Sequence, residues 1–85
     1  MSKEISINIM FFSGIDRELN LKEYDFETGI IVNIKSGTRL GNVLKNFGLK
    51  KLSRYHYFSN GERITHFTRL KFSREISILK TSGGG

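Results

Sequence analysis

The sequence predicts an α+β fold in which a mixed sheet of about five strands carries one main helix across one of its faces. Three observations lead to this expectation. The chain begins with an alternation of apolar and other residues, its middle holds apolar residues at helical spacing, and its last third holds an Asn-Gly pair and a second alternating run. A period of two residues indicates a strand, and a period of 3.6 residues indicates a helix.

The first strand is expected almost at the N-terminus, because the alternation there has a period of two. One face of this strand should be buried. Gly14 ends the strand, and the charged stretch 15–28 is expected to be a loop with a short extended piece. One side of the strand carries Ile5, Ile7, Ile9 and Phe11, and the other carries Ser6, Asn8, Met10 and Phe12.

Residues 30–34 are mostly β-branched, which favours a second strand that pairs with the first. A turn at Ser36-Gly37 follows. We expect Thr38 to be the N-cap of the main helix, over 38–47, and Gly48 to end that helix in a left-handed conformation. The apolar stripe of the helix consists of Leu40, Val43, Leu44 and Phe47, at positions i, i+3, i+4 and i+7.

Three further strands are expected after the basic segment 50–54. The aromatic-rich stretch 55–58 is the third strand, and Asn60-Gly61 is the strongest hairpin signal in the sequence. A fourth strand should follow around 63–64. The fifth strand contains Ile76 and Ile78 and leads directly into the terminal glycines.

The order β, β, α, β, β, β is that of the β-grasp, or ubiquitin-like, arrangement. The handedness of crossover connections places the first and last strands side by side, parallel and central, with the helix over the apolar face. We expect one β-grasp domain over residues 1–80 and a flexible tail over 81–85 that ends in Gly-Gly.

Composition excludes several kinds of chemistry. The 85 residues suffice for one domain, and a chain with no Cys has no disulfide and no thiolate nucleophile. Two His residues argue against a zinc or di-iron site. The apolar stretches are too short to span a membrane and the N-terminus lacks a signal-peptide pattern, so we expect a cytoplasmic protein without a membrane partner.

A formal charge of +6, from 14 Lys and Arg against 8 Asp and Glu, attracts anionic partners, although a solvated basic face explains it more simply. Nucleic acid, an acidic protein surface and a phosphorylated small molecule all fit this charge. His56 and His66 are expected on neighbouring strands as surface residues. Aromatic and basic residues interleave in a pattern that could hold single-stranded nucleic acid, although core packing explains it more simply: Arg54, Tyr55, His56, Tyr57, Phe58, Arg63, Phe67 and Arg69.

The chain given ends in Ser82-Gly83-Gly84-Gly85. Glycine lacks a Cβ, so this segment can thread into a channel too narrow for other residues. The carboxylate of Gly85 is therefore the first candidate for a reacting group. The alternative is that these glycines are an unstructured end or a remnant of an expression vector.

Four short motifs follow one another along nearly the whole chain. They are Met10-Phe11-Phe12-Ser13 with Arg17-Glu18, Gly37-Thr38 with Leu44, Asn60-Gly61 with Leu70, and Glu75-Ile76-Ser77-Ile78-Leu79 with Gly84-Gly85. Each is weak alone, but their order and spacing resemble those of the ubiquitin-like sulfur carriers. That family includes the small subunit of molybdopterin synthase (MoaD) and the thiamine carrier ThiS.

The chain departs from the family pattern at two places. Phe72-Ser73-Arg74 stands where the family usually has a Gly-Asp turn, and Leu79-Lys80-Thr81-Ser82 replaces the usual proline-containing approach to the diglycine. The turn before the last strand and the details of docking are therefore expected to differ from those of the family.

The resemblance implies a carrier that is not itself an enzyme and binds no permanent cofactor. A partner of the ubiquitin-activating type would use ATP to adenylate the carboxylate of Gly85, and sulfur would then replace AMP to give a thiocarboxylate. An acceptor of the molybdopterin synthase large-subunit type would receive the sulfur. Gly83 and Gly84 would allow threading, with Thr81 and Ser82 as hinge residues.

Other functions stay open from the sequence. The chain resembles the molybdopterin or tungstopterin branch more than the shorter thiamine carriers, but a thiamine-type carrier fits too. A protein modifier joined through Gly85 to target lysines shares the same tail, and a basic β-grasp module that binds nucleic acid is a further alternative. The expected docking patch for partners consists of Met10, Phe12 and Phe58.

Overall fold

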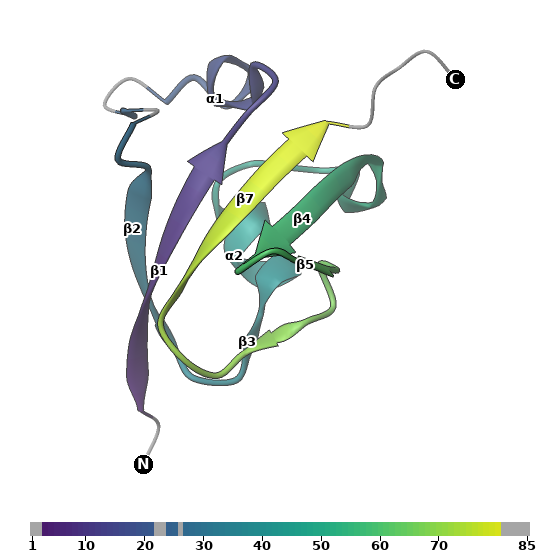
Figure 1. The fold of residues 1–85 in the computed structure, drawn as a ribbon. Helices are drawn as coiled ribbons and strands as arrows, with labels where there is room; N and C mark the ends of the chain where they lie inside the picture. Colours follow the sequence, from purple (N-terminus) through teal and green to yellow (C-terminus); the bar gives the residue numbers. More distant parts are fainter. Residues whose placement is uncertain (1–2, 22–23, 26, 81–85) are drawn as a thin grey trace.

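A computed structural model describes residues 3–21, 24–25 and 27–80 of the chain. Five strands form its main sheet in the order β2-β1-β7-β4-β5 (Figure 1). β1 and β7 are parallel neighbours, and every other neighbouring pair in this sheet is antiparallel. The strands are β1 (Glu4–Phe11), β2 (Ile30–Lys35), β4 (Tyr55–Ser59), β5 (Glu62–Ile64) and β7 (Arg74–Lys80).

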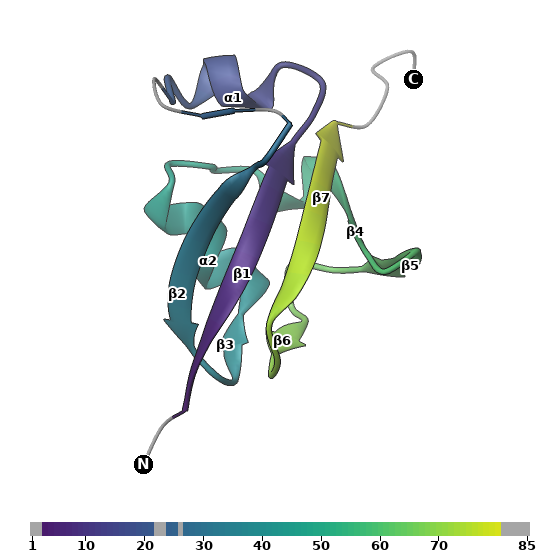
Figure 2. The same ribbon diagram turned by 60° about the vertical axis from the view of Figure 1, so that its left-hand side comes forward.

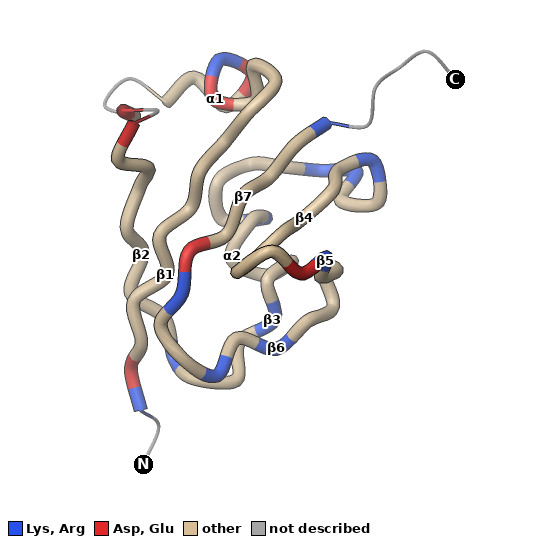
Figure 3. Tube along the Cα trace, in the orientation of Figure 1, with Lys and Arg blue, Asp and Glu red and all other residues tan. Residues whose placement is uncertain are grey.

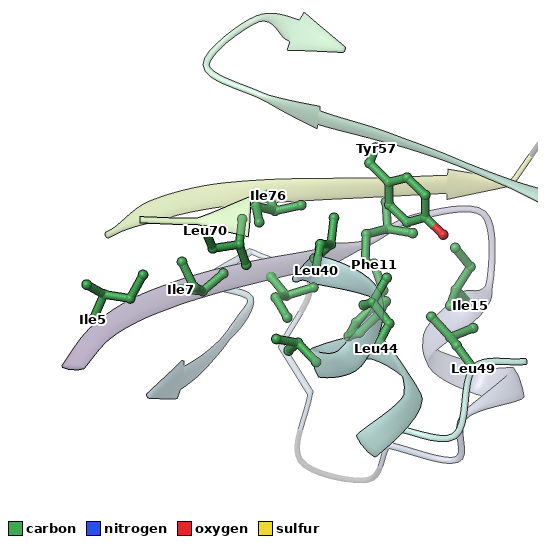
Figure 4. Close-up of a cluster of buried hydrophobic side chains, with 13 residues drawn as sticks. Ile5, Ile7, Phe11, Ile15, Leu40, Leu44, Leu49, Tyr57, Leu70 and Ile76 are labelled. Atoms are coloured by element: carbon green, nitrogen blue, oxygen red, sulfur yellow. The ribbon is translucent and has the colours of Figure 1, made fainter. Parts of the chain in front are cut away.

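One main helix, α2 (Leu40–Asn46), lies across one face of this sheet (Figure 2). The predicted α+β, β-grasp fold is thereby confirmed, including the parallel pairing of the first and last strands. The core between sheet and helix is shown in Figure 4. Its members are Ile5, Ile7, Ile9, Phe11, Ile15, Leu40, Val43, Leu44, Leu49, Tyr57, Leu70, Ile76 and Ile78.

The start of the helix differs from the prediction. Thr38 is not an N-cap: it lies in the two-residue strand β3 (Thr38–Arg39), and its Oγ1 donates to the Lys35 carbonyl at 2.6 Å. The first free N–H groups of the helix find other acceptors, because the amides of Leu40 and Gly41 donate to the carbonyls of Thr68 (3.0 Å) and His66 (2.8 Å). Backbone carbonyls of a loop distant in sequence therefore take the place of an N-cap side chain.

That loop leads into β6 (Arg69–Leu70), which pairs with β3 in a small second sheet that the sequence did not predict. The helix ends as expected. Gly48 has φ +100°, in the left-handed region where glycine is favoured.

The stretch 15–28, expected to be a loop, begins with a one-turn helix, α1 (Ile15–Glu18). Ile15 is fully buried and joins the core. Tyr24 then closes the end of β1: its hydroxyl oxygen accepts from the Phe11 amide at 2.7 Å, and the hydroxyl donates to the Phe11 carbonyl at 3.2 Å. A short 3₁₀ turn, η1 (Leu52–Arg54), precedes β4.

Within the part of the chain that is described, no helix has the length and apolar content needed to cross a membrane.

Candidate functional site

The strand that leads to the glycine tail is held on both sides. β7 lies between β1 and β4 in the sheet, so both of its edges are hydrogen-bonded. β1 pairs with β7 up to Ile78, where the Phe12 amide also donates to the Ile78 carbonyl at 2.9 Å, and β4 pairs with the end of the strand, where Tyr55 lies opposite Lys80. Lys80 also forms an ion pair with Glu18 of α1. The end of β7 is therefore held by β4, by the residue that follows β1 and by α1.

The predicted reacting and hinge residues lie outside the described part of the chain. They are Thr81, Ser82, Gly83, Gly84 and Gly85. Their roles stay predictions, as does the division into a domain over 1–80 and a tail over 81–85.

The face of the main sheet turned away from α2 carries the expected docking residues, and we call it the open face. Met10 of β1 lies opposite Ser77 of β7, which in turn lies opposite Phe58 of β4. Phe12 follows Met10 at the end of β1 and is 40% exposed. Met10, Phe12 and Phe58 thus share one surface beside the strand that leads to the tail, while their docking role stays a prediction.

Three further residues of the open face escaped the sequence analysis as docking candidates. Leu79 follows Ser77 on the same face of β7, and His56 lies opposite Leu79. Ile31 of β2 lies opposite Asn8 and is 69% exposed. For Leu79, the period of two shows that Ile78 and Leu79 must point to opposite faces of β7. Because both residues are apolar, the sequence does not tell which of them is exposed.

The interleaved aromatic and basic residues do not form one surface. Tyr57 is buried in the core, whereas Phe58 and His56 lie on the open face, where Arg63 Nη2 and His56 Nδ1 are 2.8 Å apart. Phe67 belongs to the turn after β5, on the other side of the molecule. Core packing explains Tyr57, as the simpler interpretation of the sequence held, and the remaining rings are divided between two faces.

The expected position of the two histidines on neighbouring strands is wrong. His56 is in β4, but His66 lies in the turn after β5 rather than on a neighbouring strand. The ring of His66 stacks on Tyr57 with 6.3 Å between centroids and lies 4.1 Å from the ring of Phe67. Among the described residues, no group of three His, Cys, Asp or Glu side chains is placed to hold a metal ion.

Charge is divided unequally over the described residues (Figure 3). Acidic side chains gather around α1 and the start of β2, whereas Lys and Arg predominate around β3, β6 and the segment before β4. A surface of this kind presents a positive region to an anionic partner and an opposing negative region close to α1.

Two tyrosines are held neutral by their surroundings. Burial, with a smaller contribution from the Tyr55 hydroxyl, raises the pKa of Tyr57 to about 12. Its hydroxyl donates to the Leu52 carbonyl at 2.6 Å, a hydrogen bond that only the neutral form can make. Burial also raises the pKa of Tyr24 above its ordinary value. Both side chains stabilise the fold through hydrogen bonds between their hydroxyl groups and the backbone.

Comparison of the chain with models of protein families gives no match, and comparison with curated proteins gives none either. The class that the geometry itself defines is a small β-grasp domain with a partly apolar open face. The resemblance to sulfur carriers therefore stays a prediction from the motifs quoted above.

Proposed function

We propose that the protein is a sulfur carrier whose Gly85 carboxylate is adenylated by a partner enzyme and then converted to a thiocarboxylate. The single observation that supports this most is the position of β7. It lies between β1, which pairs with its first five residues, and β4, which pairs with its last four, and the glycine-rich tail follows it in the sequence. A tail on such a strand can be inserted into another protein while the body stays folded.

The proposed chemistry occurs entirely at the acyl carbon of Gly85. A carboxylate oxygen attacks the α-phosphorus of ATP and pyrophosphate leaves, which gives an acyl adenylate. The terminal sulfur of a partner persulfide then forms a C–S bond as the C–O bond to AMP breaks, which gives an acyl disulfide. A second thiol of the partner attacks the S–S bond of this acyl disulfide, so that the thiocarboxylate leaves and the two partner sulfurs form a disulfide. Activation is needed because a carboxylate is a poor electrophile.

Partners would contact the open face and the tail together. Met10, Phe12 and Phe58 supply apolar contact, and Gly83 and Gly84 pass through the narrow entrance, with Thr81 and Ser82 at the hinge. Five residues in extended conformation span about 17 Å, a length that suits a buried active site. The acceptor we favour is a molybdopterin or tungstopterin synthase subunit, and the compartment we favour is the cytoplasm.

Intact-mass spectrometry tests the proposal. The protein is incubated with an activating enzyme, ATP and a sulfur donor, and replacement of one oxygen by sulfur adds about 16 Da. We expect Gly84→Leu, and a variant with one Ala added after Gly85, to lose this gain. A variant with one Ala added before Met1 is the matched control, because its mass is the same and its tail is unchanged. A normal gain in the variant extended after Gly85 would rule the proposal out.

Two further measurements separate the alternatives. The intact mass of the protein from its native host shows whether Gly85 is the last residue of the working form, which the proposal requires. Lysine conjugates of the chain in the same extract would instead indicate a protein modifier. Thiocarboxylate without conjugates would indicate a sulfur carrier.

A further inference from the structure

A pocket of about 140 Å³ lies on the helix side of the molecule, away from the open face. Gly41 forms part of it, and a Cβ there would crowd its neighbours, at 3.0 Å from the His66 carbonyl oxygen and 3.1 Å from Leu52 Cδ1. The side chains around the pocket are Arg39, Asn42, Lys45, Leu52, His66 and Phe67. The lining therefore combines cations with an apolar wall.

The cations beside this pocket lack carboxylate partners. Among the described residues, none of Arg39, Lys45 and Arg69 has an acidic group within ion-pair distance. Unpaired cations beside a pocket favour the binding of an oxyanion, and arginine and lysine are the usual ligands of phosphate.

A second, independent feature points to the same ligand. Arg39 of β3 lies directly opposite Arg69 of β6, so two like charges face each other across an antiparallel ladder. Such a pair is destabilising unless an anion lies near it. The one hydrogen bond given for Arg69 goes from its Nη1 to the Gly37 carbonyl at 3.2 Å, which satisfies a donor but does not neutralise the charge.

The third feature is an aromatic ring at the rim. Phe67 lines the pocket and is 68% exposed. Its neighbour His66 lies 4.1 Å away and limits its movement on one side. An exposed, supported ring next to phosphate-binding cations is the arrangement on which nucleic-acid bases stack.

We propose that this pocket binds a nucleotide, with its phosphate held by Arg39 and Lys45 and its base stacked on Phe67. The ligand chemistry is a phosphate next to a flat base, either in a free mononucleotide or in one unit of a single strand. The proposal does not depend on the sulfur-carrier function, because the pocket shares no residue with the open face or with the tail.

Titration of the ¹⁵N-labelled full chain followed by NMR tests the proposal, with AMP, adenosine, inorganic phosphate and a single-stranded oligonucleotide of about six nucleotides as probes. AMP should shift the amide signals of the pocket residues, and adenosine should bind about tenfold more weakly because it lacks the phosphate. An oligonucleotide that binds much more tightly than AMP, and more weakly at high salt, identifies the source as a strand. Equal binding identifies a free nucleotide.

Variants assign the two parts of the site. Arg39→Gln should weaken the binding of AMP about tenfold, and so should Lys45→Gln. The second variant takes the place of the first in the test if Arg39→Gln impairs folding. Phe67→Ala should weaken AMP about tenfold while leaving inorganic phosphate unchanged. The matched control is Arg63→Gln, which removes the same charge from the open face and should leave the affinity for AMP within about twofold. Thermal unfolding of each variant shows whether it is folded.

Three results would overturn the proposal. Adenosine that binds as tightly as AMP would remove the role of the phosphate. An equal loss of AMP affinity in Arg63→Gln and Arg39→Gln would reduce the effect to net charge. An acidic peptide that shifts the same amides and binds more tightly than every nucleotide probe would assign these cations to a protein partner.

Discussion

The two faces of the main sheet are built from alternate residues of the same strands, yet they differ in almost every property. On the face covered by α2, Ile76 and Ile78 of β7 are fully buried. On the open face, Phe58 is 36% exposed and Ile31 is 69% exposed. The difference teaches that one strand can hold the domain together with one set of side chains and present a surface with the other.

The largest effect expected from this comparison is on stability. Ile76→Ala removes a fully buried side chain at the centre of the core and leaves a cavity, so it should lower the free energy of unfolding by about 2–5 kcal/mol. Ser77→Ala, one residue along on the open face, should change it by less than about 0.5 kcal/mol. Urea denaturation followed by circular dichroism measures both. Equal losses would mean that the two faces are not distinct in energy.

The next effect concerns Gly29, which directly precedes β2 and lies against β1. Its φ is +77°, and a Cβ there would lie 2.5 Å from Asn8 Oδ1, 2.6 Å from Met10 Sδ and 2.8 Å from the Ile9 carbonyl oxygen. Gly29→Ala therefore combines a strained backbone with a clash against β1, and we expect it to lower the free energy of unfolding by about 2–3 kcal/mol.

Gly61→Ala is the matched control for this substitution. Its φ of +79° imposes the same strain, but no atom lies within 4 Å of the added Cβ. It should cost only about 1–2 kcal/mol. Urea denaturation of the pair separates strain from clash, and an equal loss in both variants would show that the contact with β1 is unimportant.

The sequence predicted the parts of the fold that repeat. Alternation identified β1 with its buried face, the helical stripe from Leu40 to Phe47 identified α2, and Asn60-Gly61 identified the hairpin between β4 and β5. These signals are local, since each comes from residues a few positions apart. They sufficed for the order of elements and so for the fold class.

Prediction from the sequence was wrong where the local structure depends on a segment that is distant along the chain. Thr38 has the chemistry of an N-cap, but the carbonyls of His66 and Thr68 satisfy the helix amides, and no local pattern reports a loop that distant along the chain. A helix of one turn, such as α1, is also too short to show a period. For the candidate site, the period of two placed Met10 and Phe12 on one face, but Leu79 needed the register of β7 with β4.

A smaller loss of stability than that caused by Ile76→Ala is expected at high pH. Because burial raises the pKa of Tyr57 to about 12, against about 10 in the unfolded chain, the unfolded state loses its proton first. Stability is therefore fully present below about pH 10 and is lost progressively up to about pH 12, by on the order of 2 kcal/mol.

Unfolding in urea at several pH values measures this loss. Tyr57→Phe should cost about 1 kcal/mol at pH 7, since the hydrogen bond to the Leu52 carbonyl is lost, and it should flatten the decline above pH 10. An unchanged decline in this variant would assign the alkaline loss to other groups.

A small effect on stability, together with the sharpest test of the open face, is expected from Phe58→Ala. Phe58 is already 36% exposed, so truncation should lower the free energy of unfolding by only about 1–2 kcal/mol. If the open face docks on the activating partner, the same variant should need about tenfold more carrier to reach half the maximal rate of thiocarboxylate formation, with the maximal rate itself unchanged. Phe72→Ala is the matched control, because Phe72 is 55% exposed but contacts Arg74 at the opposite end of β7 from the tail. If both variants raise this concentration equally, the effect comes from lost apolar surface in general, and the open face has no special part in docking.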